Sequence, residues 1–425
     1  MTSLGNRAVF LFEKYGFSLV LLYCFKIFSP NLSSKSSIME TDFANMVASE
    51  SGSNAFKQIF LVLMFLSYLF LAYRHSKNLS YRVLLHNLTP NIYLLVTLVA
   101  LCFISVFWSA APLLTVKRIL AQSLLIFIIS QSLLFSTLHN NNYNNVKILV
   151  LSTLILVLIS LAMGGGLDTN GELSGYQNSK NVMGSTLAVI FIIFYITGKA
   201  KLDTNQILYI TLLVVVFLFL IFTRSKTGLA LTVLFMLLTC FSNHLLRFFI
   251  LLFGLVCIVT FLVAPLYSFI LADSLQPTDN WNIAKVVGSE FFTDRGLIWG
   301  SVYYQLEYFD KMLLGYGYGA FFGTQDIPYF FDVKDSFLRF INSAHNGYIE
   351  ILSQLGVFGV FLISFIVLGF SMLRNGHLLS AALFILAYNF TESSFLRGVH
   401  VIWVMTILIL LYDRIDNITR NINES

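Results

Sequence analysis

Apolar residues dominate this chain in long runs that alternate with short polar segments. A run of about 20 apolar residues is long enough to cross the hydrocarbon core of a bilayer as an α-helix. The pattern predicts an all-α polytopic membrane protein of about twelve transmembrane helices. The predicted spans lie roughly at residues 8–28, 56–73, 91–108, 113–135, 146–163, 182–198, 206–222, 226–242, 245–271, 346–373, 378–391 and 397–412.

One polar segment, residues 272–345, is much longer than the others. A connection of this length is unusual unless it carries a function. Within it, apolar and aromatic residues recur at helical spacing from Trp299 to Phe309, which predicts a short helix. We therefore divide the chain into residues 1–271 with nine spans, the large loop 272–345, and residues 346–425 with three spans and a polar tail.

Lys and Arg gather in one set of the short loops between spans. Loops rich in Lys and Arg face the cytoplasm. This rule predicts that both termini are cytoplasmic and that the large loop lies on the opposite face of the membrane. The residues that set the orientation are Arg74, Lys77, Arg82, Lys199, Lys201, Arg247, Arg374, Arg414 and Arg420.

The composition agrees with a membrane protein, because 57% of the residues are hydrophobic and only 11% are charged. Soluble domains carry about a quarter charged residues. The net charge of +5 is accounted for by the loop pattern, so we predict no nucleic-acid partner. His, Cys, Asp and Glu show no metal-ligand spacing, and we predict no metal and no cofactor. Four cysteines lie inside apolar runs and are expected to pack there: Cys24, Cys102, Cys240 and Cys257.

The segment Ser343–Glu350 marks the point where the large loop meets the tenth span. His345 is the side chain in this segment best suited to moving a proton near neutral pH. Ser343 is a candidate N-cap of the following helix, and Asn346 could orient His345 or hydrogen-bond a sugar. Glu350 could be a partner of His345 or a carboxylate that the helix dipole favours.

Several cations lie on the predicted outer face, where the orientation rule does not require them. Ionisable residues at membrane depth are costly and are functional candidates by default. Arg118, Arg224 and Arg295 stand out, because the guanidinium fork matches phosphate oxygens. With His345 they predict an anionic, phosphate-bearing ligand. Lys117 and Lys226 fit interfacial anchors. Arg397 could extend to the interface or pair with Glu392.

Five segments, taken in order, resemble motifs of the O-antigen ligase and polysaccharide polymerase family. They are Ser105–Pro112 with Arg118 beyond it, Gly175–Gly184 with its Lys180-Asn181 pair, Thr223–Thr227, Thr293–Trp299 followed by Gly315–Gly319, and His345-Asn346 with Gly356 and Gly359. Two positions depart from the family pattern, which often has Arg near Lys226 and Gly in place of Asp294. Which of Arg224 and Lys226 would contact phosphate therefore stays open.

The resemblance implies a metal-independent glycosyltransferase of the bacterial inner membrane. Its donor would be a glycan on undecaprenyl diphosphate. The acceptor would be a sugar hydroxyl at the periplasmic face, on lipid A–core for a ligase or on another lipid-linked repeat unit for a polymerase. In this reading His345 is the general base, and Arg224 and Arg295 stabilise the diphosphate leaving group. Supporting contacts to substrate are expected from Arg118, Lys180, Asn181, Lys226, Asn346 and Arg397.

A transporter or flippase for lipid-linked sugars is the alternative reading. Twelve spans and outer-face cations would suit such a protein. Transporter folds, however, often carry two matching halves, and no internal repeat is visible in this sequence. A long outer loop that leads into His345-Asn346 is also not needed for transport.

Overall fold

The structure is a computed structural model of the chain, and it describes residues 3–33, 55–199, 206–272, 295–322 and 343–424. Within these ranges the regular elements are fourteen α-helices and two short 3₁₀ helices, with one isolated β-bridge between Leu167 and Leu173. Seven stretches of the described residues are long and apolar enough to cross a membrane. The prediction of an all-helical, multi-pass membrane protein is confirmed.

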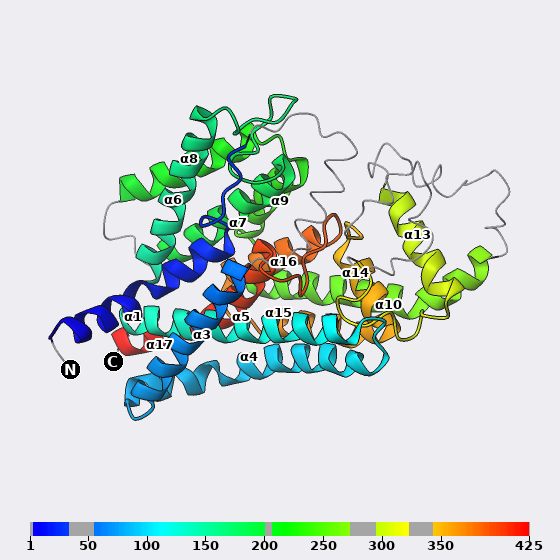
Figure 1. Cartoon of the computed structure of the whole chain (residues 1–425), viewed down its shortest axis with the longest axis horizontal. Coiled ribbons are helices and arrows are strands. Elements are labelled where there is room, and N and C mark those ends of the chain that lie inside the picture. Colours follow the sequence, from blue (N-terminus) through cyan, green and yellow to red (C-terminus); the bar gives the residue numbers. More distant parts are fainter. Residues whose placement is uncertain (1–2, 34–54, 200–205, 273–294, 323–342, 425) are drawn as a thin grey trace.

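The helices follow one another with short connections over most of the chain (Figure 1). Each predicted span overlaps one of them, with two exceptions: residues 91–108 cover the end of α4 and η1, and residues 346–373 form α14, η4 and α15 in succession. The short helix expected in the large loop is α13. The bounds are α1 (Ser3–Cys24), α3 (Ala55–His75), α4 (Leu79–Ile104), η1 (Ser105–Trp108), α5 (Pro112–Leu138), α6 (Asn142–Ala162), α7 (Lys180–Lys199), α8 (Gln206–Phe222), α9 (Lys226–Leu238), α10 (Asn243–Ala272), α13 (Arg295–Tyr308), α14 (Gly347–Leu355), η4 (Gly356–Phe358), α15 (Gly359–Ser371), α16 (Gly376–Tyr388) and α17 (Val401–Glu424).

The candidate spans differ in length. The seven long ones are Gln58–His75, Pro90–Trp108, Pro112–Leu138, Asn142–Ala162, Lys180–Gly198, Asn243–Leu262 and Gly347–Ser371. Helices α8, α9 and α16 are apolar but shorter. With 13 residues each, α9 and α16 rise only about 20 Å, less than the roughly 30 Å of a hydrocarbon core. Their flanking loops would therefore have to enter the membrane.

Helix α17 forms the centre of the bundle. It packs against α4, α5, α7 and α16, and all eleven residues from 401 to 411 are buried. A helix that is apolar on every side is stable only when other helices surround it. The indole nitrogen of Trp403 donates to Oε1 of Gln122 in α5 at 2.9 Å, so the one large polar group in this stretch is satisfied.

Both ends of the chain lie at the same end of the molecule, and α13 lies at the opposite end (Figure 1). An even number of membrane crossings gives this arrangement, because it returns the chain to the side on which it started. Helix α13, the described helix of the large loop, is therefore separated from the two ends of the chain by the length of the bundle.

Glu13 is an acidic residue within the first apolar run, and the structure explains why it is tolerated there. It is only 7% exposed. Its Oε1 lies 2.9 Å from Nε2 of His75, the last residue of α3, and its Oε2 lies 3.2 Å from Nε2 of His139, which follows α5. A buried carboxylate is costly unless it is paired in this way. Glu13 thus joins α1, α3 and α5 near the chain termini.

We expect Glu13→Ala to lower the free energy of unfolding by about 1–3 kcal/mol, because it leaves two half-buried imidazoles without their acceptor. The thermal midpoint of the purified protein in detergent measures this loss. Glu13→Gln is the matched control and should lose less, since it keeps one acceptor oxygen. An unchanged midpoint in Glu13→Ala would show that the two histidine contacts contribute no stability.

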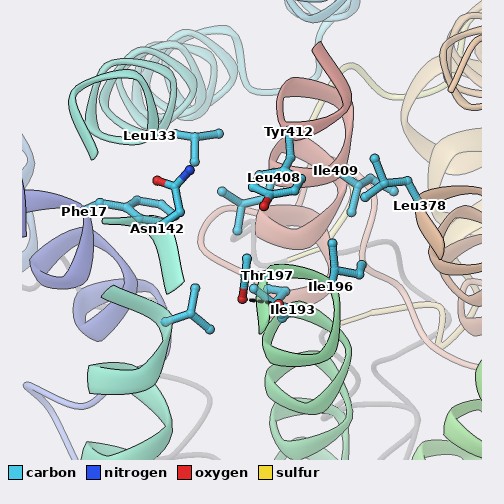
Figure 2. A pocket seen from close by; sticks show the side chains of 11 residues that line it. Phe17, Leu133, Asn142, Ile193, Ile196, Thr197, Leu378, Leu408, Ile409 and Tyr412 are labelled. Atoms are coloured by element: carbon cyan, nitrogen blue, oxygen red, sulfur yellow. Dashed lines mark hydrogen bonds between the residues drawn. The ribbon is translucent and has the colours of Figure 1, made fainter. Parts of the chain in front are cut away.

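A mainly apolar cavity lies among α1, α5, α6, α7, α16 and α17 (Figure 2). It is found where α6 and α16 begin and α7 ends, next to the predicted cytoplasmic loops. The residues that line it are Phe17, Leu133, Asn142, Val146, Ile193, Ile196, Thr197, Leu378, Leu408, Ile409 and Tyr412. None of them is a residue that the sequence assigns to substrate, so the candidate site has to be built elsewhere.

Candidate active site

His345 lies in a sharp turn that leads the chain into α14. Its φ of 47° is in the left-handed region, which few residues other than glycine adopt. Such backbone conformations persist only where the surroundings enforce them, and they are common at functional sites. Asn346 is the N-cap of α14, since its Oδ1 accepts from the amides of Tyr348 (2.9 Å) and Ile349 (3.2 Å). The expected cap, Ser343, was wrong.

The start of α14 is tied to the chain that follows α16. The amide of Gly347 donates to the carbonyl of Asn389 at 2.7 Å, and the amide of Asn346 donates to Oγ of Ser393 at 3.1 Å. Oδ1 of Asn389 in turn accepts from the amide and the hydroxyl of Ser394. A Cβ atom at position 347 would collide with this Oδ1, so glycine is required there. These bonds fix the backbone of both segments.

Glu392 links two of the residues that the sequence assigned to the site. Its Oε2 lies 3.0 Å from Nδ1 of His345, and its Oε1 lies 2.7 Å from Nη2 of Arg295 in α13. Nη1 of Arg295 donates to the carbonyl of Thr391. The structure therefore brings His345 and Arg295 together through one carboxylate, although they come from different parts of the chain.

Arg397 does not form the predicted pair with Glu392. Within the described residues the ion pairs of Glu392 are with Arg295 and His345. Nη1 of Arg397 instead lies 3.5 Å from the carbonyl of Ser393. Sequence reasoning considered Glu392 only as a partner of this nearby arginine. One sequence feature could have identified Glu392. It is an acidic residue in a short loop on the predicted outer face, where several arginines are also predicted to lie.

The three linked side chains differ in exposure. Arg295 is 17% exposed and Glu392 is 19% exposed, whereas the His345 side chain is 38% exposed. Nε2 of His345 has no hydrogen bond in the described part of the chain. The imidazole is thus held at Nδ1 and open at Nε2, and a fixed imidazole of this kind can accept a proton from a bound molecule.

Glu350 contacts the backbone before His345 rather than its imidazole. Its Oε2 accepts from the amide of Ala344 at 2.8 Å, and Oε1 lies 3.3 Å from Nε2 of Gln354. The indole nitrogen of Trp299 donates to the carbonyl of Ala344 at 3.0 Å. The residue before the turn is therefore held from both sides, by α14 and by α13.

The glycine-rich run 315–319 passes between the turn that precedes α5 and the end of α14. The amide of Ala110 donates to the carbonyl of Tyr316, and the amide of Gly317 donates to the carbonyl of Gln354, both at 2.8 Å. A Cβ atom at Gly317, whose φ is 95°, would lie 2.6 Å from Cα of Ser109. Only glycine fits this approach, which brings two of the predicted motifs into contact.

Arg118 anchors the end of this run. Its Nη1 donates to the carbonyl of Gly319 and lies 3.4 Å from that of Phe322. Arg118 also interacts electrostatically with Glu350 and Arg397. Arg118 thus lies near Glu350 and Arg397, and its Nη1 is bound to the loop.

The aromatic side chains near this run are anchored to the protein. Tyr318 is buried, and its hydroxyl donates to the carbonyl of Leu396. Trp299 is held at Ala344, as described above. These two aromatic side chains are structural anchors of the loop. Residues 323–342 of the large loop lie outside the described residues, as do Thr293 and Asp294.

A second group of predicted residues surrounds the starts of α7 and α9. Arg224, Lys226 and Asn181 are exposed, and their side chains form no hydrogen bond or ion pair with described residues. Arg224 has a φ of 50°. Lys180 differs from them, because its Nζ pairs with Oε2 of Glu172.

Two glycines bring the predicted motifs 175–184 and 223–227 together. A Cβ atom at Gly184 would collide with Cβ of Ser225, and one at Gly228 would lie 3.1 Å from the carbonyl carbon of Gly184. The backbone of α7 and the link before α9 are thus as close as they can be. Close approach of this kind is the usual role of small residues between membrane helices.

Tyr388 connects the two groups. Its hydroxyl contacts that of Ser185, the residue after Gly184, and it interacts electrostatically with Glu392, Arg295 and Arg397. Tyr388 at the end of α16 thus lies between α7 and the carboxylate that holds His345. The cavity of Figure 2 is lined by the opposite ends of these helices, where α7 ends and α16 begins.

Comparison with protein-family models matched residues 209–364 to Wzy_C, a family described as O-antigen ligase. The matched stretch runs from α8 to α15 and includes Arg224, Arg295 and His345. Comparisons with curated proteins and with solved structures gave no match. The resemblance expected from the motifs is thus confirmed for residues 209–364, which match the model of the O-antigen ligase family.

Proposed function

We propose that this chain is a glycosyltransferase of bacterial surface polysaccharide assembly. It transfers a glycan from undecaprenyl diphosphate to a sugar hydroxyl at the periplasmic face of the inner membrane, and it crosses that membrane twelve times. The observation that carries the proposal is the group of His345, Glu392 and Arg295, two of which lie in the segment matched to O-antigen ligases.

The reaction is a displacement at the anomeric carbon of the donor glycan. The acceptor hydroxyl loses its proton to Nε2 of His345, and its oxygen forms the new bond to the anomeric carbon. The bond from that carbon to the diphosphate oxygen breaks, and the electron pair leaves with undecaprenyl diphosphate. A base at the acceptor and cations at the leaving group would stabilise the charges that develop in this step.

Arg295 and Arg224 are proposed to bind the diphosphate. Guanidinium groups can do so without a metal ion, because they neutralise charge and donate two parallel hydrogen bonds. Arg118, Lys226 and Arg397 would supply further positive charge, and Asn181 a polar contact. Lys180 would bind substrate only if it leaves Glu172. Asn346 acts indirectly, since it fixes the turn that holds His345.

Purified protein in liposomes tests the proposal. The donor is a glycan on undecaprenyl diphosphate, and the two acceptors are lipid A–core and a second lipid-linked repeat unit. We expect transfer to one of them, which distinguishes ligase from polymerase, and we expect it to persist in EDTA. Movement of the donor across the bilayer without transfer to either acceptor would refute the enzyme and favour a flippase.

A further inference from the structure

Glu392 accepts hydrogen bonds from two groups with different roles in the proposed reaction. His345 is the base at the acceptor, and Arg295 binds the leaving diphosphate. Oε2 holds Nδ1 of His345 and Oε1 holds Nη2 of Arg295. The three side chains come from the turn before α14, the loop after α16 and the start of α13. Because the two partners share one carboxylate, a change in its contact with one of them alters its contact with the other.

Arg295 is partly occupied in this arrangement. Nη2 donates to Glu392 and Nη1 donates to the carbonyl of Thr391, so both terminal nitrogens of the guanidinium group are bound to protein oxygens. A diphosphate presents oxygens of higher charge than one carboxylate and competes for the same N–H groups. Donor binding at Arg295 and the pairing of Arg295 with Glu392 are consequently in competition.

Proton acceptance by His345 depends on the same carboxylate. When Nε2 takes the proton of the acceptor hydroxyl, the imidazole becomes a cation, and a carboxylate at Nδ1 stabilises that cation and fixes the ring. Glu392 does this best when its charge is not shared with Arg295. Among the described residues, the other charged or titratable groups around this site are Arg397, Tyr388 and Glu350, with Arg118 and His400 beside them. Of the two carboxylates, Glu350 is bound to the Ala344 amide and Gln354.

We propose that Glu392 is a positioning residue that couples donor binding to proton acceptance. The diphosphate draws Arg295 away from Oε1, and the carboxylate then acts on His345 alone. In the absence of donor, Arg295 offsets the charge of Glu392, and the base is less effective. This inference rests on the proposed function, and it concerns the order of events within that same site.

Glu392→Gln keeps the size of the side chain and removes its charge. It therefore separates the effect of Glu392 on His345, which kcat reports, from its competition with the donor for Arg295, which donor binding reports. We expect kcat to fall about 10²-fold, comparable to the loss of a residue that supports a catalytic ligand. The KM for donor should stay the same or fall, because Arg295 is released from its competitor. Binding of undecaprenyl diphosphate alone, measured on the intact protein, should likewise be unchanged or tighter. The thermal midpoint should stay close to that of the wild type.

A double-mutant cycle provides the control. If Glu392 acts through His345, Glu392→Gln should change the residual rate of a His345→Ala protein by less than twofold. If Glu392→Gln does not fold, Glu392→Asp serves instead: it keeps the charge but is too short to reach both partners, and kcat should fall about tenfold.

Three results would overturn the coupling: a wild-type kcat in either Glu392 variant, a tenfold weaker binding of undecaprenyl diphosphate by Glu392→Gln, or additive losses in the double mutant. Failure of the proposed function looks different, since the wild type would then transfer no glycan. The binding measurement tests the competition at Arg295 even in that case.

Discussion

Replacing His345 by alanine is expected to lower the rate of glycan transfer by about 10²–10⁴-fold, the usual contribution of a positioned general base. The reason is specific to this residue. Its Nδ1 is held by Glu392 at 3.0 Å and its Nε2 has no partner among the described residues, so the variant loses an imidazole that is fixed at one nitrogen and open at the other. Initial rates with a saturating lipid-linked donor in liposomes measure the loss, and the protein should still insert in the membrane.

The backbone at this position calls for a second variant. Alanine at a φ of 47° is strained, and the loss in His345→Ala could then come from the turn rather than from the chemistry. Asparagine tolerates the left-handed region better than most residues, so His345→Asn separates the two causes and should be as inactive as His345→Ala. The exposed His86 gives the matched control, and His86→Ala should keep the wild-type rate. A His345→Asn protein with a tenth of the wild-type rate would exclude His345 as the base.

The helices could be predicted from sequence because each depends on its own apolar run. The break inside the tenth predicted span could not. There the chain leaves the helix at Gly356, whose φ is 58°, and the amide of Val357 donates to the carbonyl of Met312 at 3.0 Å. A contact with a segment more than forty residues earlier leaves no local pattern. Gly356 and Gly359 indicated close packing, and at Gly356 the close neighbour is the backbone of Leu313.

The candidate site, too, could be predicted only in part. His345 and Arg295 were assigned from motifs, and the structure joins them. Glu392 was not assigned to the site because its partners lie 47 and 97 residues away, and the sequence considered it only as one possible partner of the nearby Arg397. Lys180 shows the same effect on a shorter scale. The chain turns back at Leu167 and Leu173, and Glu172 then reaches a lysine that the sequence assigned to substrate.

Arg295→Ala is expected to lower kcat by about 10²–10³-fold, the usual cost of removing a group that stabilises developing charge. It should also raise the KM for donor, because the variant loses a cation next to the leaving diphosphate. Arg295→Lys should recover little, since one ammonium cannot hold Glu392 and Thr391 in the geometry of the fork. Steady-state kinetics with varied donor separate the two parameters.

The control for Arg295 has to remove an outer-face cation without touching the proposed site. Lys117 meets this condition, because it is exposed and forms no hydrogen bond or ion pair with described residues. Lys117→Ala should change kcat and the KM for donor by less than twofold, and so distinguish a fixed contact from general attraction of an anion. If Arg295→Ala behaves like Lys117→Ala while Arg224→Ala loses activity, the diphosphate binds at the link 223–227 instead. Glu392 would then hold Arg295 only as part of the fold.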